Sequence, residues 1–236
     1  MDETQTEKTV PETAGEATAR ATEGPHSART TVRRGKDRAM YDDRMFGVLD
    51  AGMVAHVGVG TPTGPVVLPM AYGWIDGFLY LHGAAGNAML RAAVGTEICV
   101  TVTILDGLVI ARSPFHNSMN YRSVVVRGVA RAVEGVEKNE ALRVINDHIV
   151  ENWASGRLPT EAETRRTLVL KVPLTEMSGK MRAGDPVDEP EDLHGPHWAG
   201  QLPIDSTWGE TISAADLVSS VEPPPAVADL AGKNLP

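Results

Sequence analysis

The sequence has a single cysteine, Cys99, few aromatic residues (5%), and no apolar run near the ~20 residues that cross a bilayer as a helix. One thiol excludes a disulfide within the chain and a metal centre built from several cysteines, and it suits a reducing compartment. The first residues are acidic, whereas a secretory signal begins with positive charge and continues with an apolar core. We therefore expect a cytoplasmic protein without a membrane segment.

Positive charge is in deficit as well. The chain has 22 lysine and arginine residues against 31 aspartate and glutamate residues, which gives a formal net charge of -9. An acidic surface repels phosphate backbones and anionic headgroups. This balance argues against nucleic acid and membrane as partners.

Several signatures of catalysis are missing. There is no phosphate-binding loop ending in Gly-Lys-Ser or Gly-Lys-Thr, and no Gly-x-Ser-x-Gly nucleophile elbow. His194 and His197 stand in a Pro-rich loop, but a metal site needs three or four converging ligands and no others are identifiable nearby. We predict no metal site.

The two ends of the chain lack the residues that build a core. Residues 1–28 contain no aromatic residue and one valine, and residues 221–236 contain four prolines. Too little apolar surface is available there to offset the entropy lost on ordering. We predict a disordered N-terminal tail at residues 1–29, a folded domain at residues 30–213, and a Pro-rich C-terminal tail at residues 214–236 that trails across the surface or dangles.

Between the tails, short strand-like runs outnumber helical ones. In residues 97–104 apolar and polar side chains alternate, which places one face of a strand in the core. Asp76-Gly77 separates two such runs and suits a tight hairpin turn, because glycine accepts a positive φ. The predicted strands are residues 53–59, 66–74, 78–82, 98–104, 107–112, 121–133 and 167–173, and the predicted helices are residues 37–50 and 136–153.

Most of the connections are too short for parallel crossovers. They favour a closed or split antiparallel β-barrel over a doubly wound sheet, and the predicted fold is mainly β with peripheral helices. Barrels hide most of their strand edges, and an edge or apolar face that stays exposed invites a second copy of the chain. We therefore expect a homodimer.

Residues 104–128 carry the strongest functional signal. Two runs rich in β-branched residues, 107–111 and 124–126, bracket a dense group of hydrogen-bonding side chains in the connection between them. Rigid strands that hold such donors beside an apolar wall form a site for a flat ligand with a polar tail. The alternative is a polar hairpin tip.

A second candidate is His82, which ends a strand-like run and precedes Gly83-Ala-Ala-Gly86. Small residues let a ligand or another backbone approach closely. The histidine is either a ligand-facing group or a side chain hydrogen-bonded at a barrel rim.

With these segments assembled, the sequence resembles the pyridoxamine 5'-phosphate oxidase-related, FMN-binding split-barrel family, in its nitroimidazole-reductase-like branch. The resemblance covers about residues 33–204. It is carried by DRAMYDDRMFGVLDAGMVAHVGV, LYLHGAAGNAMLR, VTVTILDGLVIARSPFHNSMNYRSVVVRGVA and SGKMRAGDPVDEPEDLHGPHWAGQLP. It implies a split β-barrel, a homodimer with ligand sites at the subunit interface, and FMN as the usual cofactor.

Carried over residue by residue, the resemblance implies that residues 67–70 lie along the isoalloxazine ring. His82 would be catalytic, facing the substrate as a proton donor or positioning group. Arg122, with Lys180 or Arg182, would hold the phosphate. The cofactor-binding residues implied are Val67, Leu68, Pro69, Met70, Leu81, His82, Gly83, Asn87, Ser118, Asn120, Tyr121, Arg122, Ser123, Lys180, Arg182 and Trp198.

One departure concerns the phosphate. Where relatives commonly have Ser-Arg or Arg-Lys, this chain has Asn87-Ala88. Losing the basic partner removes a charge-assisted hydrogen bond worth roughly 1.5 to 3 kcal/mol, which weakens the inference of FMN binding.

The sequence predicts an FMN-dependent oxidoreductase that takes electrons from NADH, NADPH or a substrate and passes them to a small organic molecule. Two alternatives stay open. One is the same barrel with haem or a deazaflavin, for which His82 and His116 are available, and the other is a non-catalytic dimer that binds a flavin or a metabolite.

Overall fold

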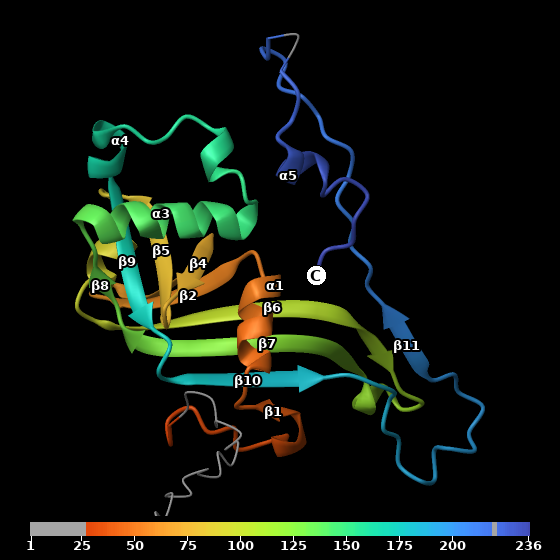
Figure 1. The fold of residues 1–236 in the computed structure, drawn as a ribbon. Helices are drawn as coiled ribbons and strands as arrows, with labels where there is room; N and C mark the ends of the chain where they lie inside the picture. The colour runs from red at the N-terminus through yellow and green to blue at the C-terminus, as the bar shows by residue number, and fades with distance from the viewer. Residues whose placement is uncertain (1–26, 219–220) are drawn as a thin grey trace, which may run out of the picture.

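The computed structural model describes residues 27–218 and 221–236, arranged as two antiparallel sheets with helices around them (Figure 1). The larger sheet has seven strands in the order β1-β10-β7-β6-β2-β3, with β11 pairing with β6. The smaller sheet has four strands in the order β4-β5-β9-β8. The strands are β1 (Ala39–Met40), β2 (Ala55–Thr61), β3 (Gly64–Met70), β4 (Tyr72–Ile75), β5 (Phe78–Ala84), β6 (Glu97–Ile110), β7 (Ser118–Val129), β8 (Arg131–Ala132), β9 (Thr167–Pro173), β10 (Met177–Arg182) and β11 (Gly200–Pro203).

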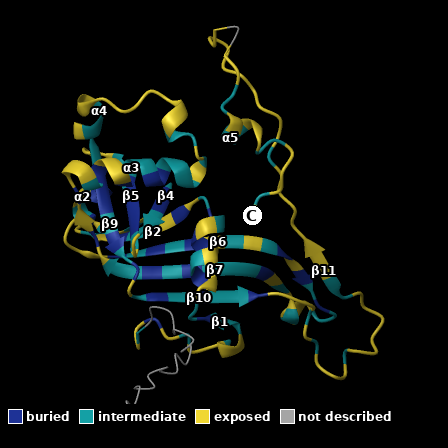
Figure 2. Ribbon diagram, in the orientation of Figure 1, coloured by how far each residue is buried: buried dark blue, intermediate teal, exposed yellow. Residues whose placement is uncertain are grey.

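The main core lies between the two sheets. Alternating residues of β6 and β7, among them Val100, Val102 and Val124, are fully or almost fully buried and pack with Leu81 of β5 and Leu170 of β9. Figure 2 shows buried residues in the strands of both sheets. The sheets do not close into one ring. The fold is an antiparallel split barrel with peripheral helices, which confirms the predicted fold class.

Three of the helices position the candidate site. Helix α3 (Gly135–Ile149) lies across the smaller sheet, where Ala141 and Ile145 pack against Tyr80 and Val169 (Figure 1). The chain then passes over α3 through the 3-10 turn η3 (Trp153–Ser155) and α4 (Glu161–Arg165). The remaining helices are α1 (Arg44–Ala51), α2 (Ala88–Ala93), α5 (Pro225–Ala228) and the 3-10 turns η1 (Lys36–Arg38) and η2 (Pro114–His116).

Several predicted elements are present. β9 has the predicted bounds, and the Asp76-Gly77 turn joins β4 and β5 with positive φ values of 50° and 77°. The predicted alternation in β6 is confirmed, since Ile98, Val100 and Val102 are buried.

Other predicted elements are wrong in extent. The predicted helix at residues 37–50 starts only at Arg44, because residues 39–40 form β1 and pair with β10. The predicted strand at residues 66–74 is two strands, because Met70 pairs with β2 in one sheet and Tyr72 pairs with β5 in the other. The predicted helix at residues 136–153 is α3, which ends at Ile149. Strands β10 and β11 were not predicted.

The polar connection predicted between residues 111 and 124 is present but shorter, since it spans residues 111–117. β6 runs without a break to Ile110, and β7 begins at Ser118. The polar residues at 118–123 therefore belong to a strand, and strand geometry sends successive side chains to opposite faces. They do not form a single cluster at a loop.

The C-terminal segment forms an arm that extends from the end of β11 away from the barrel (Figure 1). After α5 the chain returns to residues 206–208, where the backbone N–H of Leu235 donates to the carbonyl of Ser206 (2.8 Å) and that of Trp208 donates to the carbonyl of Lys233 (2.9 Å). Leu235 and Pro236 then line a cavity of about 440 Å³ at the barrel.

Of the predicted N-terminal tail, residues 1–26 lie outside the described residues. Residues 27–30 form a hydrogen-bonded turn, and Arg29 forms an ion pair with Glu97 of β6. Within the described ranges, no helix is both long enough and apolar enough to span a membrane.

Candidate functional site

Strand β7 distributes the predicted polar residues over the two faces of the larger sheet. Arg122 stands opposite Ile104 of β6, and Ser123 stands opposite Thr103 of β6 and Lys180 of β10. Directly opposed residues in an antiparallel pair share a face. Arg122 and Lys180 therefore lie on opposite faces, so the predicted phosphate pair of Arg122 with Lys180 is not formed.

Arg122 lines a cavity of about 450 Å³ between β6, β7, β10 and β11, which we name the Arg122 cavity. Its guanidinium donates to the carboxylate of Asp106 from both Nη2 (2.8 Å) and Nε (3.1 Å). This two-pronged geometry is the strongest form of arginine pairing. The Arg122 charge is therefore neutralised within the chain.

Arg182 lines the same cavity and is also fully engaged. Its buried guanidinium donates to Asn120 Oδ1 and to the carbonyls of Gly184 (3.1 Å) and Asp185 (2.9 Å). The Asn120 amide in turn donates to Gln201 of β11 (2.7 Å). This network holds the loop that follows β10 against the barrel.

Lys180 lines a different cavity, of about 390 Å³, on the outer face of the larger sheet; we name it the Lys180 cavity. Its walls include Arg29 and Arg33 from the N-terminal segment and Arg127 from β7. Arg29 and Arg127 both pair with Glu97. The side chains of Lys180 and Arg33 form no hydrogen bond or ion pair with any residue that the structure describes.

Strand β3, predicted to lie along the flavin ring, forms one edge of the larger sheet. Its free side has no strand partner in the described part of the chain, so its backbone donors and acceptors face outward. Val67 is 62% exposed and Leu68 is 38% exposed, while Met70 is partly buried against the core. The strand offers an apolar surface beside an unpaired backbone edge, although Pro65 and Pro69 have no N–H to donate there.

His82 lines a third cavity, of about 450 Å³, enclosed by β5, α3 and the segment between η3 and α4; we name it the His82 cavity. The ring Nδ1 is buried and has no hydrogen-bond partner among the described residues. Burial lowers the pKa of the imidazole, because desolvation disfavours the charged form. The apolar wall consists of Leu142, Ile145, Ile149 and Trp153.

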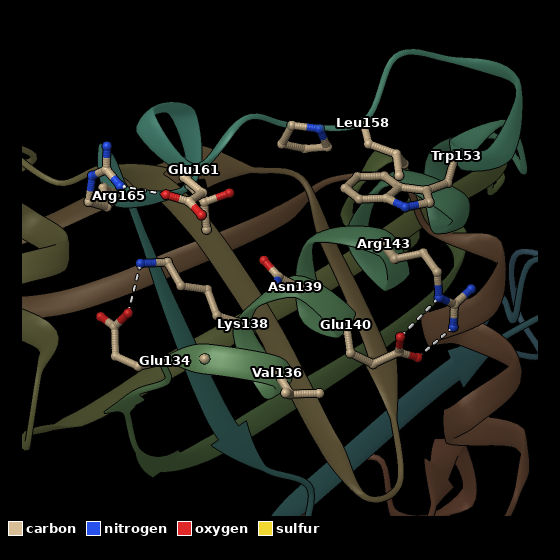
Figure 3. A pocket seen from close by; sticks show the side chains of 13 residues that line it. Glu134, Val136, Lys138, Asn139, Glu140, Arg143, Trp153, Leu158, Glu161 and Arg165 are labelled. Carbon is tan, nitrogen blue, oxygen red and sulfur yellow. Dashed lines mark hydrogen bonds and ion pairs between the residues drawn. The ribbon is translucent and has the colours of Figure 1, made fainter.

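A neighbouring groove of about 560 Å³ shares Trp153, Pro159 and Thr164 with the His82 cavity. Figure 3 shows its side chains, which come from α3 and from the segment above it. The charged groups pair internally, since Lys138 donates to Glu134 (3.0 Å) and Arg143 donates to Glu140 (2.6 Å). No cation in this groove lacks a partner within the chain's described part.

The remaining predicted residues are dispersed. Asn87 accepts from the backbone N–H of Leu90 (3.1 Å) and caps α2, which is the role its side chain has in this fold. Leu81 is fully buried in the core, and Trp198 is 67% exposed. Ser118 and Tyr121 lie along β7, and Gly83 lies against Leu90.

His82 and Arg122 line different cavities of one chain. His116 lies in η2, within 4.0 Å of Glu189, and lines none of the cavities described above. Four contributing residues were not predicted from sequence, namely Asp106, Arg127, Arg33 and Trp153. The sequence signal for Arg33 is a positively charged stretch before β1 in an otherwise acidic chain.

The family model for pyridoxamine 5'-phosphate oxidase matches residues 42–181. The chain belongs to the pyridoxamine 5'-phosphate oxidase family. The resemblance predicted from the sequence is thereby confirmed. A search of the curated proteins finds no match.

Solved structures within this family include close relatives of the chain. The flavocytochrome Anf3 from Azotobacter vinelandii is 33% identical and superposes with a TM-score of 0.83, covering 89% of this chain and 100% of that chain. The FAD and haem binding protein from Mycobacterium smegmatis is 31% identical, with a TM-score of 0.77, covering 82% of this chain and 96% of that chain. A candidate 5-nitroimidazole antibiotic resistance protein from Bacteroides thetaiotaomicron is 25% identical, with a TM-score of 0.50, covering 60% of this chain and 85% of that chain.

The residues present in this member of the pyridoxamine 5'-phosphate oxidase family fit a flavin in two respects. β3 presents exposed apolar side chains next to unpaired backbone groups, which suits a planar ring with a polar edge. The same outer face carries the cations Lys180 and Arg33, which have no partner among the described residues. A phosphate-bearing tail needs such groups.

Proposed function

We propose that the protein is a flavin-dependent oxidoreductase whose flavin lies on the outer face of the larger sheet, with its ring at β3. The observation that carries this proposal is the exposed Val67 of the edge strand β3, which lies on the same face of the larger sheet as Lys180, a cation without a partner among the described residues. Family membership and the flavin-binding names of two relatives above 30% identity support it.

The flavin is FMN or FAD. The family resemblance favours FMN, while the name of the Mycobacterium smegmatis relative specifies FAD. Both carry phosphate on the tail and the same ring, so the residues proposed to hold them are the same. Mass identification of the molecule released by denaturation separates the two.

The flavin would supply two-electron and one-electron transfer between a donor such as NADH or NADPH and a small organic acceptor. The chain would contribute binding and orientation. Val67 would exclude water from one side of the ring, and the unpaired backbone groups of β3 would fix its polar edge.

A second copy of the chain would complete the site. The outer face of the larger sheet and the edge of β3 expose Val67, Leu68, Leu105 and Met119, which a homodimer would cover. Sedimentation or light scattering should then give twice the mass of the 25.2 kDa chain. A monomer at micromolar concentration would contradict this part of the proposal.

The absorption spectrum of the purified protein tests the function directly. A flavoprotein is yellow, and anaerobic NADH or NADPH should bleach it. A colourless protein that binds neither added FMN nor added FAD would refute flavin binding. A bound flavin that no donor bleaches would favour the non-catalytic, storage alternative.

A haem is a second candidate cofactor, supported by His82. A neutral imidazole is a common metal ligand, and the desolvation that lowers the pKa of partly buried His82 favours the neutral form. The unpartnered Nδ1 and the apolar wall of the His82 cavity fit a flat, mostly apolar macrocycle held through one histidine. Haem would supply one-electron chemistry, and Trp153 and Ile149 would shield it from water.

A Soret band in the purified or haem-reconstituted protein is the expected result. His82→Ala should abolish it, whereas His116→Ala, in a histidine outside the cavity, should leave it unchanged. A Soret band that survives in His82→Ala would show that the ligand is another residue.

A further inference from the structure

The Lys180 cavity stands out by charge in an acidic protein. Four cationic side chains line it, Arg29, Arg33, Arg127 and Lys180, in a chain of net charge -9. Two carboxylates pair with members of this group, because Glu97 holds Arg29 and Arg127, and Glu176 lies 3.5 Å from Arg29. The other two, Arg33 and Lys180, have no carboxylate partner among the described residues.

A row of directly paired residues on the outer face leads from β3 to the Lys180 cavity. Val67 of β3 stands opposite Gly58 of β2, Gly58 opposite Cys99 of β6, and Cys99 opposite Arg127 of β7. Neighbouring strands lie about 4.8 Å apart, so this row spans roughly 14 Å from β3 to β7. It connects the proposed ring position with the cations.

Small residues make this row a shallow path. A Cβ at Gly58 would make ordinary van der Waals contacts with the carbonyl oxygen of Cys99 (3.6 Å) and the Val67 side chain (3.8 Å), so the glycine leaves a dip of about one methyl group in this row. Cys99 and the adjacent Thr101 are only partly buried, while Val67 and Arg127 rise at the two ends. An extended chain of polyol length can lie along such a surface without displacing a side chain.

The cations at the end of the path are of two kinds. Arg127 lies 3.1 Å from Glu97 and is partly compensated. Lys180 and Arg33 have no partner among the described residues, and Ser178 adds a hydroxyl to the same wall. Hydrogen bonds from charged donors to phosphate are stronger than those from neutral donors. The cavity therefore contains charged hydrogen-bond donors that could bind an anion.

We propose that the Lys180 cavity is a subsite for the phosphate or diphosphate of the flavin tail, with Lys180 and Arg33 as the main donors. This inference rests on the proposed function for the identity of the ligand. It assigns the phosphate to the outer face of the sheet, in place of the basic pair that this chain replaces with Asn87-Ala88.

Affinities for riboflavin, FMN and FAD test the subsite, because riboflavin has the same ring and polyol but no phosphate. The wild type should bind FMN more tightly than riboflavin. Replacing both cations in Arg33→Gln/Lys180→Gln should weaken FMN about 10- to 100-fold and leave riboflavin within about twofold. Arg91→Gln, which removes one exposed charge from α2, is the control and should change neither affinity.

Two results would contradict the proposed phosphate subsite without contradicting flavin binding. One is equal affinity of the wild type for riboflavin and FMN. The other is a double variant that keeps the full preference for FMN. Either would place the phosphate elsewhere.

Failure of the proposed function looks different, since no flavin would then bind at all. Inorganic diphosphate, titrated calorimetrically, probes the cavity in that case. Binding to the wild type that is lost in Arg33→Gln/Lys180→Gln supports an anion subsite, and no heat with the wild type overturns it.

Discussion

The two cavities that flank strands β7 and β10 contain similar side chains in different states of pairing. In the Arg122 cavity, Asp106 accepts from Arg122, and Asn120 and two carbonyls accept from Arg182. In the Lys180 cavity, Lys180 and Arg33 have no acceptor among the described residues. Basic residues in a cavity favour an anion only when the chain has not already supplied their acceptors, because a ligand would otherwise have to displace them. The two arginines prominent in the sequence are structural by this criterion.

The largest expected effect comes from Arg182→Ala. The change leaves the buried amide oxygen of Asn120 and the carbonyls of Gly184 and Asp185 without their donor, and we expect the free energy of unfolding to fall by about 3 kcal/mol. Urea denaturation measures it. The preference for FMN over riboflavin should persist in the folded fraction, and a loss of stability below about 0.5 kcal/mol would show that the network is dispensable.

The next largest effect concerns the path across the outer face. Gly58→Val adds a branched side chain where the polyol would lie, and we expect FMN and riboflavin both to bind about tenfold more weakly, because the added methyl groups would occupy the position of the polyol. Gly60→Val is the matched control, because it lies on the same face of β2 beyond the row. If Gly58→Val binds both flavins with unchanged affinity, the polyol does not lie along this row.

A smaller effect is expected when Asp106 is neutralised. Asp106→Asn frees the Arg122 guanidinium, and because both side chains are about one-third exposed we expect a loss of only about 1 kcal/mol. The variant should also gain weak binding of inorganic phosphate. Calorimetry on a variant that also carries Arg33→Gln/Lys180→Gln measures phosphate binding by the Arg122 cavity alone. If this variant binds no phosphate, the ion pair with Asp106 is not what prevents the cavity from binding an anion.

The smallest effect has the opposite sign. Glu97→Gln removes the carboxylate that pairs with Arg29 and Arg127, and we expect FMN to bind about threefold more tightly. Fluorescence titration of the flavin resolves such a change, and riboflavin should not respond. Weaker FMN binding in Glu97→Gln would indicate that the carboxylate orients the arginines instead of competing for them.

Most of the fold could be predicted from local patterns. The alternation of Ile98, Val100 and Val102 and the Asp76-Gly77 turn depend on period and backbone freedom, which the sequence displays directly. β10 could not be recognised in the same way, since Ser178-Gly-Lys reads as a basic turn until β1 and β7 pair with it.

The sequence identified most of the basic residues of the site, but not which of them lie together. Arg122, Lys180 and Arg182 were identified as the basic residues, but only strand register shows that Arg122 and Lys180 face opposite ways. The side-chain acceptors Asp106 and Asn120 lie 16 and 62 positions away from Arg122 and Arg182, and such pairings leave no local signal. The helix-capping role of Asn87 likewise appears only when α2 forms behind it.

The most direct test is a crystal structure of the protein with FMN or FAD bound. We predict phosphate oxygens within about 3 Å of Lys180 Nζ or of the Arg33 guanidinium, on the outer face of the larger sheet. A phosphate located beside Arg122, or at the start of α2 beside Asn87, would contradict the central claim.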